Sequence, residues 1–74
     1  MKNVRIYTRE ELENLLSELK EDLGFIELYY DWNTNVDNLA LSIEDAEYYL
    51  EYGSLSKATY HVIQGFKFVD LITV

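Results

Sequence analysis

The chain has 74 residues, 49% of them hydrophobic and 15% aromatic, which is enough for one small core and too little for a second domain. It has no cysteine and one histidine, which excludes disulfides, thiolate metal sites and two-histidine chemistry. Fourteen acidic residues against six basic ones give a net charge of -8, which disfavours binding to nucleic acid or anionic membranes and favours basic partners. With no apolar run long enough for a membrane span and no signal region, we expect a single cytoplasmic domain over residues 1–74.

The first third of the chain predicts a short strand and then a helix. Residues 4–7 alternate in polarity, as a strand does. Thr8, followed three residues later by Glu11, forms a capping box, which is typical of a helix start. Gly24 stands where a left-handed helix end is expected, so we predict a helix over residues 9–23. Its apolar face would consist of five leucines at helical spacing: Leu12, Leu15, Leu16, Leu19 and Leu23.

The middle of the chain predicts a hairpin and a second helix. Residues 25–32 are dense in aromatic and branched side chains, which favours a strand, and residues 33–35 have the composition of a loop. Leu39 and Leu41 alternate, so residues 25–41 are expected to form a hairpin. Ser42 would then cap a helix over residues 42–52 that ends at Gly53. The apolar side of this helix would be formed by Ile43, Ala46, Tyr49 and Leu50.

The last third fits two interpretations. The β-branched content of residues 59–63 favours a strand, whereas Ser54, Leu55, Ala58 and Val62 also fit a short helix. We prefer the strand, turning at Gln64-Gly65 into a closing strand over residues 66–74. The predicted fold is therefore α+β, with a mostly antiparallel sheet of about four to five strands and two helices.

Three weaker patterns do not complete a chemical site. Residues 31–37 resemble the start of a calcium loop, but Val36 replaces the turn glycine and Ser42 the bidentate glutamate. His61 has no fixed nucleophile or orienting partner in the sequence. Adjacent carboxylates are frequent, but a chain this short has little material for a catalytic cleft. We therefore expect no catalytic residue, no metal and no cofactor.

The predicted second helix carries the strongest functional signal. At 100° per residue, Glu44, Glu47 and Glu51 fall on one stripe, with Tyr48 and Tyr52 on the next. No lysine or arginine occurs between Lys20 and Lys57. Such a face either keeps the protein soluble or presents carboxylates in place of the phosphates of a nucleic acid. On the second interpretation the partner-binding residues are Glu18, Glu21, Asp22, Glu44, Asp45, Glu47, Tyr48, Glu51 and Tyr52.

In its size, its acidity, its lack of cysteine and the run from Glu44 to Tyr52, the chain resembles the small acidic inhibitors of bacteriophages. These viral proteins include anti-CRISPR proteins, antirestriction proteins and inhibitors of uracil-DNA glycosylase. They have diverse folds and share no motif, so no residue role is carried over. The resemblance implies a non-enzymatic inhibitor that covers the basic DNA- or guide-binding surface of a host protein, such as a CRISPR-Cas effector, by DNA mimicry.

A different class of function remains open. The chain would then be a small structural or regulatory subunit that pairs with itself or with a larger chain. Pairing would use an apolar face or the edge strand predicted over residues 66–74, which only Lys67 and Asp70 would protect.

Overall fold

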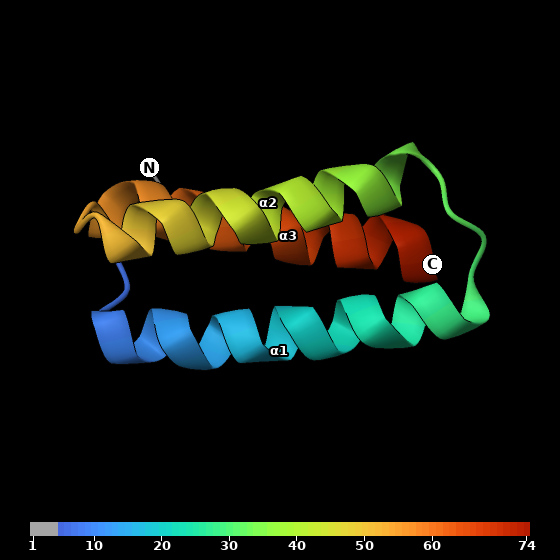
Figure 1. Ribbon diagram of the computed structural model, residues 1–74, viewed down its shortest axis with the longest axis horizontal. Coiled ribbons are helices and arrows are strands. Elements are labelled where there is room, and N and C mark those ends of the chain that lie inside the picture. The colour runs from blue at the N-terminus through green and yellow to red at the C-terminus, as the bar shows by residue number, and fades with distance from the viewer. Residues whose placement is uncertain (1–4) are drawn as a thin grey trace.

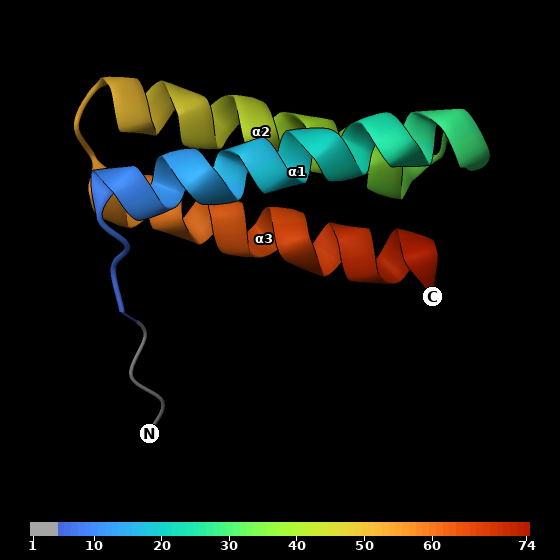
Figure 2. The same ribbon diagram turned by 90° about the horizontal axis from the view of Figure 1, so that it is seen from below.

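The computed structural model describes residues 5–74, and over that range the protein is built from helices without a strand. The helices are α1 (Arg9–Tyr29), α2 (Thr34–Glu51) and α3 (Leu55–Thr73). Helices α1 and α3 run in the same direction, and α2 runs in the opposite direction between them in the chain (Figure 1). Seen from below, α1 lies in front, with α2 on one side of it and α3 on the other (Figure 2). The predicted α+β fold is therefore wrong, and the molecule is a three-helix bundle.

One apolar spacing explains why all three segments are helical. In each helix the core residues recur alternately at three and four positions, which places them on a single stripe. Each stripe faces the same core, so three amphipathic helices bury one another. The stripes consist of Leu12, Leu16, Leu19, Leu23 and Ile26 in α1, of Val36, Leu39, Ile43, Ala46 and Leu50 in α2, and of Leu55, Ala58, Val62, Gly65, Val69 and Ile72 in α3.

Helix α1 begins where the sequence predicts and ends later. The Thr8 hydroxyl accepts a hydrogen bond from the Glu11 amide, and the Glu11 carboxylate accepts one from the Thr8 amide, which confirms the capping box. The predicted end at Gly24 is wrong, because Gly24 lies inside the helix and α1 continues to Tyr29. The physical reason is Ile26, which extends the leucine stripe by one more turn and is buried.

The hairpin predicted over residues 25–41 is also wrong. Residues 30–33 connect α1 to α2, and the Asn33 side chain caps α2 by accepting a hydrogen bond of 3.1 Å from the Val36 amide. Helix α2 therefore starts eight residues before the predicted start at Ser42, which is buried within the helix. Its predicted end is confirmed, because Gly53 has a φ of 87°, a backbone conformation that favours glycine.

The strands predicted over residues 59–63 and 66–74 are wrong, and the helical alternative is correct over a longer range. The β-branched residues of α3 fit either conformation, and burial against α1 and α2 decides for the helix. Gly65 permits a close approach of α3 to α1, because a Cβ atom there would lie 2.9 Å from Leu19 Cδ1. No edge strand remains for the subunit hypothesis.

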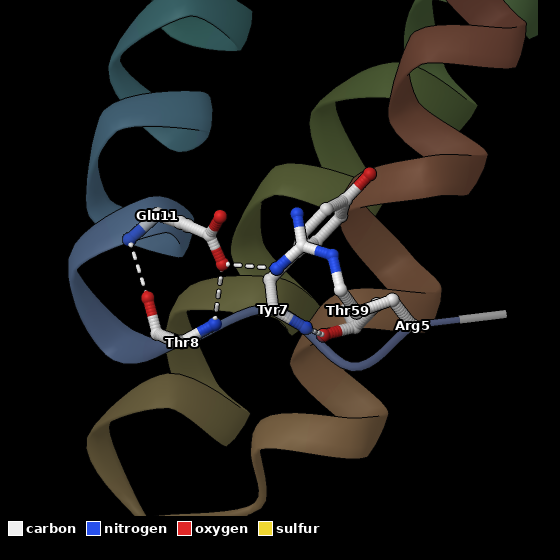
Figure 3. A network of polar contacts seen from close by, with 5 residues as sticks. All are labelled: Arg5, Tyr7, Thr8, Glu11 and Thr59. Carbon is white, nitrogen blue, oxygen red and sulfur yellow. Dashed lines mark hydrogen bonds and ion pairs between the residues drawn. The ribbon is translucent and has the colours of Figure 1, made fainter.

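Polar contacts join the segment before α1 to α3 and to the first turn of α1 (Figure 3). The strand predicted over residues 4–7 begins at Val4, outside the described residues, and residues 5–7 are not in a strand. The Tyr7 amide donates a hydrogen bond of 3.0 Å to Thr59 Oγ1 in α3. The Arg5 guanidinium contacts Glu11 Oε1 at 2.8 Å. This contact and the Thr8 amide together lower the pKa of Glu11 from 4.5 to about 2.

Candidate functional site

The outward face of α2 brings exposed aromatic and acidic side chains together. Tyr48 and Tyr52 are 55% and 70% exposed, and their ring centroids are 4.7 Å apart. The sequence places these two residues on one stripe of the helix, and their rings are in contact at an interplanar angle of 45°. Large exposed tyrosines on a helix face are more typical of binding surfaces than of ordinary surface.

Tyr48 lies at the centre of this face. On a helix surface the neighbours of a residue stand three and four positions away, with Cβ atoms about 5–6 Å apart. For Tyr48 these four neighbours are three carboxylates and one tyrosine, without a basic residue. We call this set the Tyr48 face; it consists of Glu44, Asp45, Tyr48, Glu51 and Tyr52.

The carboxylates of the Tyr48 face are free of cations from the protein itself. Glu44, Asp45 and Glu51 are exposed, and the ion pairs of residues 5–74 involve none of them. Those pairs join Arg5 to Glu11 and Lys20 to Glu47. Three uncompensated negative charges therefore surround one accessible ring.

Glu47 does not belong to this face, although the sequence places it on the same stripe as Glu44 and Glu51. It is half-buried on the side of α2 that faces α1, where its carboxylate forms an ion pair with Lys20. Beside it Arg9 Nη2 donates a hydrogen bond of 2.7 Å to the Leu50 carbonyl, at the negative end of α2. Two of the few basic residues are thus used to join α1 to α2.

These contacts lie in an open groove of about 380 Å³ between α1 and α2. Both helices contribute charged side chains to its walls, and the Lys20–Glu47 pair crosses it. Part of its lining therefore joins the two helices, whereas Glu13 and Glu51 at its walls are in neither of the ion pairs of residues 5–74. The groove is lined by Arg9, Glu13, Leu16, Ser17, Lys20, Glu47, Leu50 and Glu51.

The other three predicted partner-binding residues lie on α1, apart from the Tyr48 face. At 100° per residue, Glu18 and Asp22 are about 160° around α1 from Lys20, which faces α2. Glu21 is about 100° from Lys20 on the same basis and is exposed. The structure therefore divides the predicted acidic surface into two faces on different helices.

Sequence reasoning missed the N-terminal half of the α2 face. Because α2 starts at Thr34, Asp37 and Leu41 continue the outward face by seven-residue steps toward Glu44 and Tyr48. The Trp32 indole N–H donates to the Asp37 carboxylate, which places an exposed ring at the start of this face. The missed signal was the spacing of Val36, Leu39 and Ile43, which predicts a helix before Ser42.

The weaker patterns do not form a site in the described part of the chain. His61 lies on α3 rather than on a strand, and its ring stacks on Tyr49 at 5.5 Å with an interplanar angle of 4°. Residues 34–37 of the calcium-like segment belong to α2. Across residues 5–74, no three histidine or acidic side chains converge as a metal-binding group. In the same range, no helix combines the length and apolar character of a membrane span.

Comparisons with known proteins identify no relative of this chain. No protein-family model, curated protein or solved structure matches it. What the chain binds is therefore inferred from the charges, exposure and contacts of its own side chains.

Proposed function

We propose that this protein is a non-enzymatic acidic inhibitor whose α2 face binds a basic, nucleic-acid-binding surface of a host protein. Bound there, it prevents the host protein from binding DNA or guide RNA, because it contacts the lysines and arginines that hold the nucleic acid. The proposal keeps the functional class of the small acidic phage inhibitors and places the protein in the cytoplasm of the host cell. It requires no cofactor, no metal and no direct contact with nucleic acid or membrane.

The observation that carries the proposal is the exposure of two tyrosines among unpaired carboxylates on the Tyr48 face. Unpaired acids repel one another, so this arrangement contributes little to the stability of the fold. Solubility alone accounts for the carboxylates but gives no reason to expose two large rings between them. A basic protein surface satisfies both features, because it neutralises the charges and covers the rings.

The spacing of the acids supports competition for a basic surface rather than a copy of each phosphate. With Glu47 paired to Lys20, the outward row consists of Asp37, Glu44 and Glu51. Seven residues of helix span about 10.5 Å, whereas phosphates on a DNA strand are about 3.4 Å apart along the axis. One carboxylate of this row thus corresponds to about three phosphates, and Asp45 adds charge beside it.

Competition for labelled DNA tests the proposal. The protein is titrated into complexes of a fluorescent duplex with three purified targets: a CRISPR-Cas effector loaded with guide, a restriction endonuclease and a uracil-DNA glycosylase. We expect stoichiometric release of the duplex from one of them, measured by fluorescence anisotropy. Added salt should weaken the inhibitory complex, because charge attraction is screened over about 8–10 Å near physiological ionic strength.

Charge reversals identify the face that binds. Glu44→Lys/Glu51→Lys should lose the inhibition, whereas the matched control Glu27→Lys/Asp70→Lys changes the net charge equally on α1 and α3 and should keep it. Glu18→Lys/Glu21→Lys tests the second acidic face. Glu47 is left unchanged, because a lysine there would face Lys20. Equal inhibition by the α2 variant and wild type, or no release of DNA from any target, would contradict the proposal.

A second candidate function rests on a separate observation. The C-terminal end of α1 and the connection to α2 expose a group of large apolar side chains: Phe25, Leu28, Tyr29, Tyr30 and Trp32. The rings of Phe25 and Tyr29 are 4.7 Å apart, so part of the group is contiguous. Exposed apolar patches of this kind mark interaction sites. They favour the function of a small subunit that pairs with a second copy through this end of the bundle.

The molar mass in solution tests this second candidate. Sedimentation equilibrium should show a dimer that persists at high salt, because apolar contact is not weakened by screening. Leu28→Glu should shift the protein to the monomer, whereas Leu41→Glu, at an exposed leucine elsewhere, should not. A monomer at every protein and salt concentration would exclude this function.

A further inference from the structure

The Tyr48 ring is held from the core side and open on the solvent side. It meets Tyr49 edge to face, with centroids 5.2 Å apart and an interplanar angle of 85°. Tyr49 is half-buried and stacks on His61 of α3, which restricts its ring. Tyr52 flanks Tyr48 at 4.7 Å. The aromatic neighbours therefore limit the positions of the Tyr48 ring and leave more than half of its side chain available to a partner.

The protein already uses tyrosine rings to bind cations elsewhere. The Arg5 guanidinium carbon lies 5.1 Å from the centroid of the Tyr7 ring, and Lys57 Nζ lies 5.2 Å from that of Tyr49. No such contact is made to Tyr48 or Tyr52 by the residues that the structure describes. Tyr48 and Tyr52 are therefore exposed to solvent beside three carboxylates, and no cation of the described residues contacts either ring.

The geometry of this surface selects among cations. A divalent metal needs oxygens that converge on one point, whereas Glu44 and Asp45 lie one turn before Tyr48 and Glu51 one turn after it, and no three acidic side chains of residues 5–74 converge. An ammonium group is compact and strongly hydrated, so it gains little from stacking. A guanidinium group is planar and weakly hydrated, and it stacks on a ring while its edge donates hydrogen bonds to carboxylates. The surroundings of Tyr48 fit the last of these.

We propose that the Tyr48 face is an arginine-selective docking site for the basic protein partner. An arginine side chain of the partner stacks on the Tyr48 ring, and its N–H groups donate to Glu44 and Glu51. Tyr52 covers the flank of the stacked group, and Asp45 adds negative charge. This inference rests on the proposed function and adds to it the kind of side chain that the partner must present.

Two labelled peptides of equal charge test the inference on the full chain: nona-arginine and nona-lysine. Binding is measured by fluorescence anisotropy at several salt concentrations. We expect wild type to bind nona-arginine about two- to fivefold more tightly than nona-lysine, the ratio expected of an exposed cation–π contact. In NMR spectra, nona-arginine should shift the Tyr48 ring signals and the amides of Glu44 and Glu51.

Tyrosine variants test whether the Tyr48 ring is the cause of the tighter binding of nona-arginine. Tyr48→Leu should remove the preference for arginine and keep the charge-driven binding, whereas Tyr48→Phe, which retains the ring, should keep both. The matched control is Tyr60→Leu, because Tyr60 on α3 is 58% exposed and has no acidic residue three or four positions away. Circular dichroism checks that each variant is folded.

The outcomes separate the inference from the proposed function. Equal affinity of wild type for the two peptides, or a preference that survives in Tyr48→Leu, would overturn the arginine-selective site and leave the charge-driven inhibitor intact. Absence of binding to either peptide at low salt would overturn both. If Tyr48→Leu fails to fold, the arginine-selective site is still tested by the affinities of wild type for the two peptides and by the NMR shifts.

Discussion

Gly65 of α3 lies directly against Leu19 of α1, at a distance at which an added methyl group would force the Leu19 side chain to move. A Cβ atom at Gly65 would stand 2.9 Å from Leu19 Cδ1, and Leu19 is fully buried. Gly24 in α1 offers the opposite situation, because a Cβ atom there would have no neighbour within 4 Å. The two glycines are both inside helices, so they form a matched pair for testing the packing of α1 on α3.

Gly24→Ala should stabilise the protein by about 0.5–1 kcal/mol, because alanine is the better helix former and the site is open. Gly65→Ala gains the same helix propensity but overpacks the contact with Leu19, at a cost of about 1–3 kcal/mol. Urea denaturation should therefore rank Gly65→Ala below Gly24→Ala by about that cost. Equal stabilities would show that α3 does not approach α1 as closely as described.

Leu39 and Leu41 distinguish the helix from the hairpin that the sequence suggests. In a strand both side chains would share one face, whereas in α2 Leu39 is fully buried and Leu41 is exposed. Leu39→Ala should reduce the free energy of unfolding by about 2–5 kcal/mol. Leu41→Ala should change it by less than about 0.5 kcal/mol. Similar losses in both variants, measured by chemical denaturation, would contradict the helical assignment.

The Glu11 carboxyl should titrate at about pH 2 in the folded protein, below its ordinary pKa of 4.5. The Arg5 contact and then the Thr8 amide stabilise the charged form. Because the folded-state pKa is the lower one, the stabilisation is present above pH 4.5 and is lost as the pH falls through about 2. The NMR signal of the Glu11 carboxyl carbon reports this midpoint. Arg5→Gln should raise it, and a wild-type midpoint near 4.5 would contradict the contact.

The Lys20–Glu47 ion pair should couple α1 to α2 only modestly. Both side chains are partly exposed, and exposed pairs contribute about 0.2–1 kcal/mol. A double-mutant cycle of Lys20→Met and Glu47→Gln should give a coupling energy in that range, and salt should reduce it. A coupling energy of zero at low salt would show that Glu47 is available to a partner, as the sequence alone suggests.

Several features were readable from the sequence because they depend on residues within one helical turn. The capping box of Thr8 and Glu11, the end of α2 at Gly53 and the contact between the Tyr48 and Tyr52 rings are of this kind. The leucine stripe of α1 was predicted for the same reason, since helical spacing alone places Leu12, Leu16 and Leu19 on one face. Each of these features depends on residues of one helix and does not require a contact with another helix.

Tertiary structure decided the conformation of residues 25–41 and 55–73. Short windows rich in tyrosine, phenylalanine and β-branched residues satisfy a strand and a buried helix equally well, so propensity alone favoured the wrong state there. The helix wins because Val36, Leu39, Val62 and Val69 continue a three-four spacing whose burial requires two other helices.

The candidate site shows the same division. The Tyr48 face follows from residue spacing within α2, so the sequence determined most of it. The removal of Glu47 from that face depends on Lys20, which is 27 positions earlier in the chain and meets it only when α1 packs on α2. The Tyr48 face is separated from Glu18, Glu21 and Asp22 for a similar reason, because the packing of α1 decides which of its sides faces the core. A contact between distant residues leaves no periodic signal in either helix, so only the folded bundle could assign it.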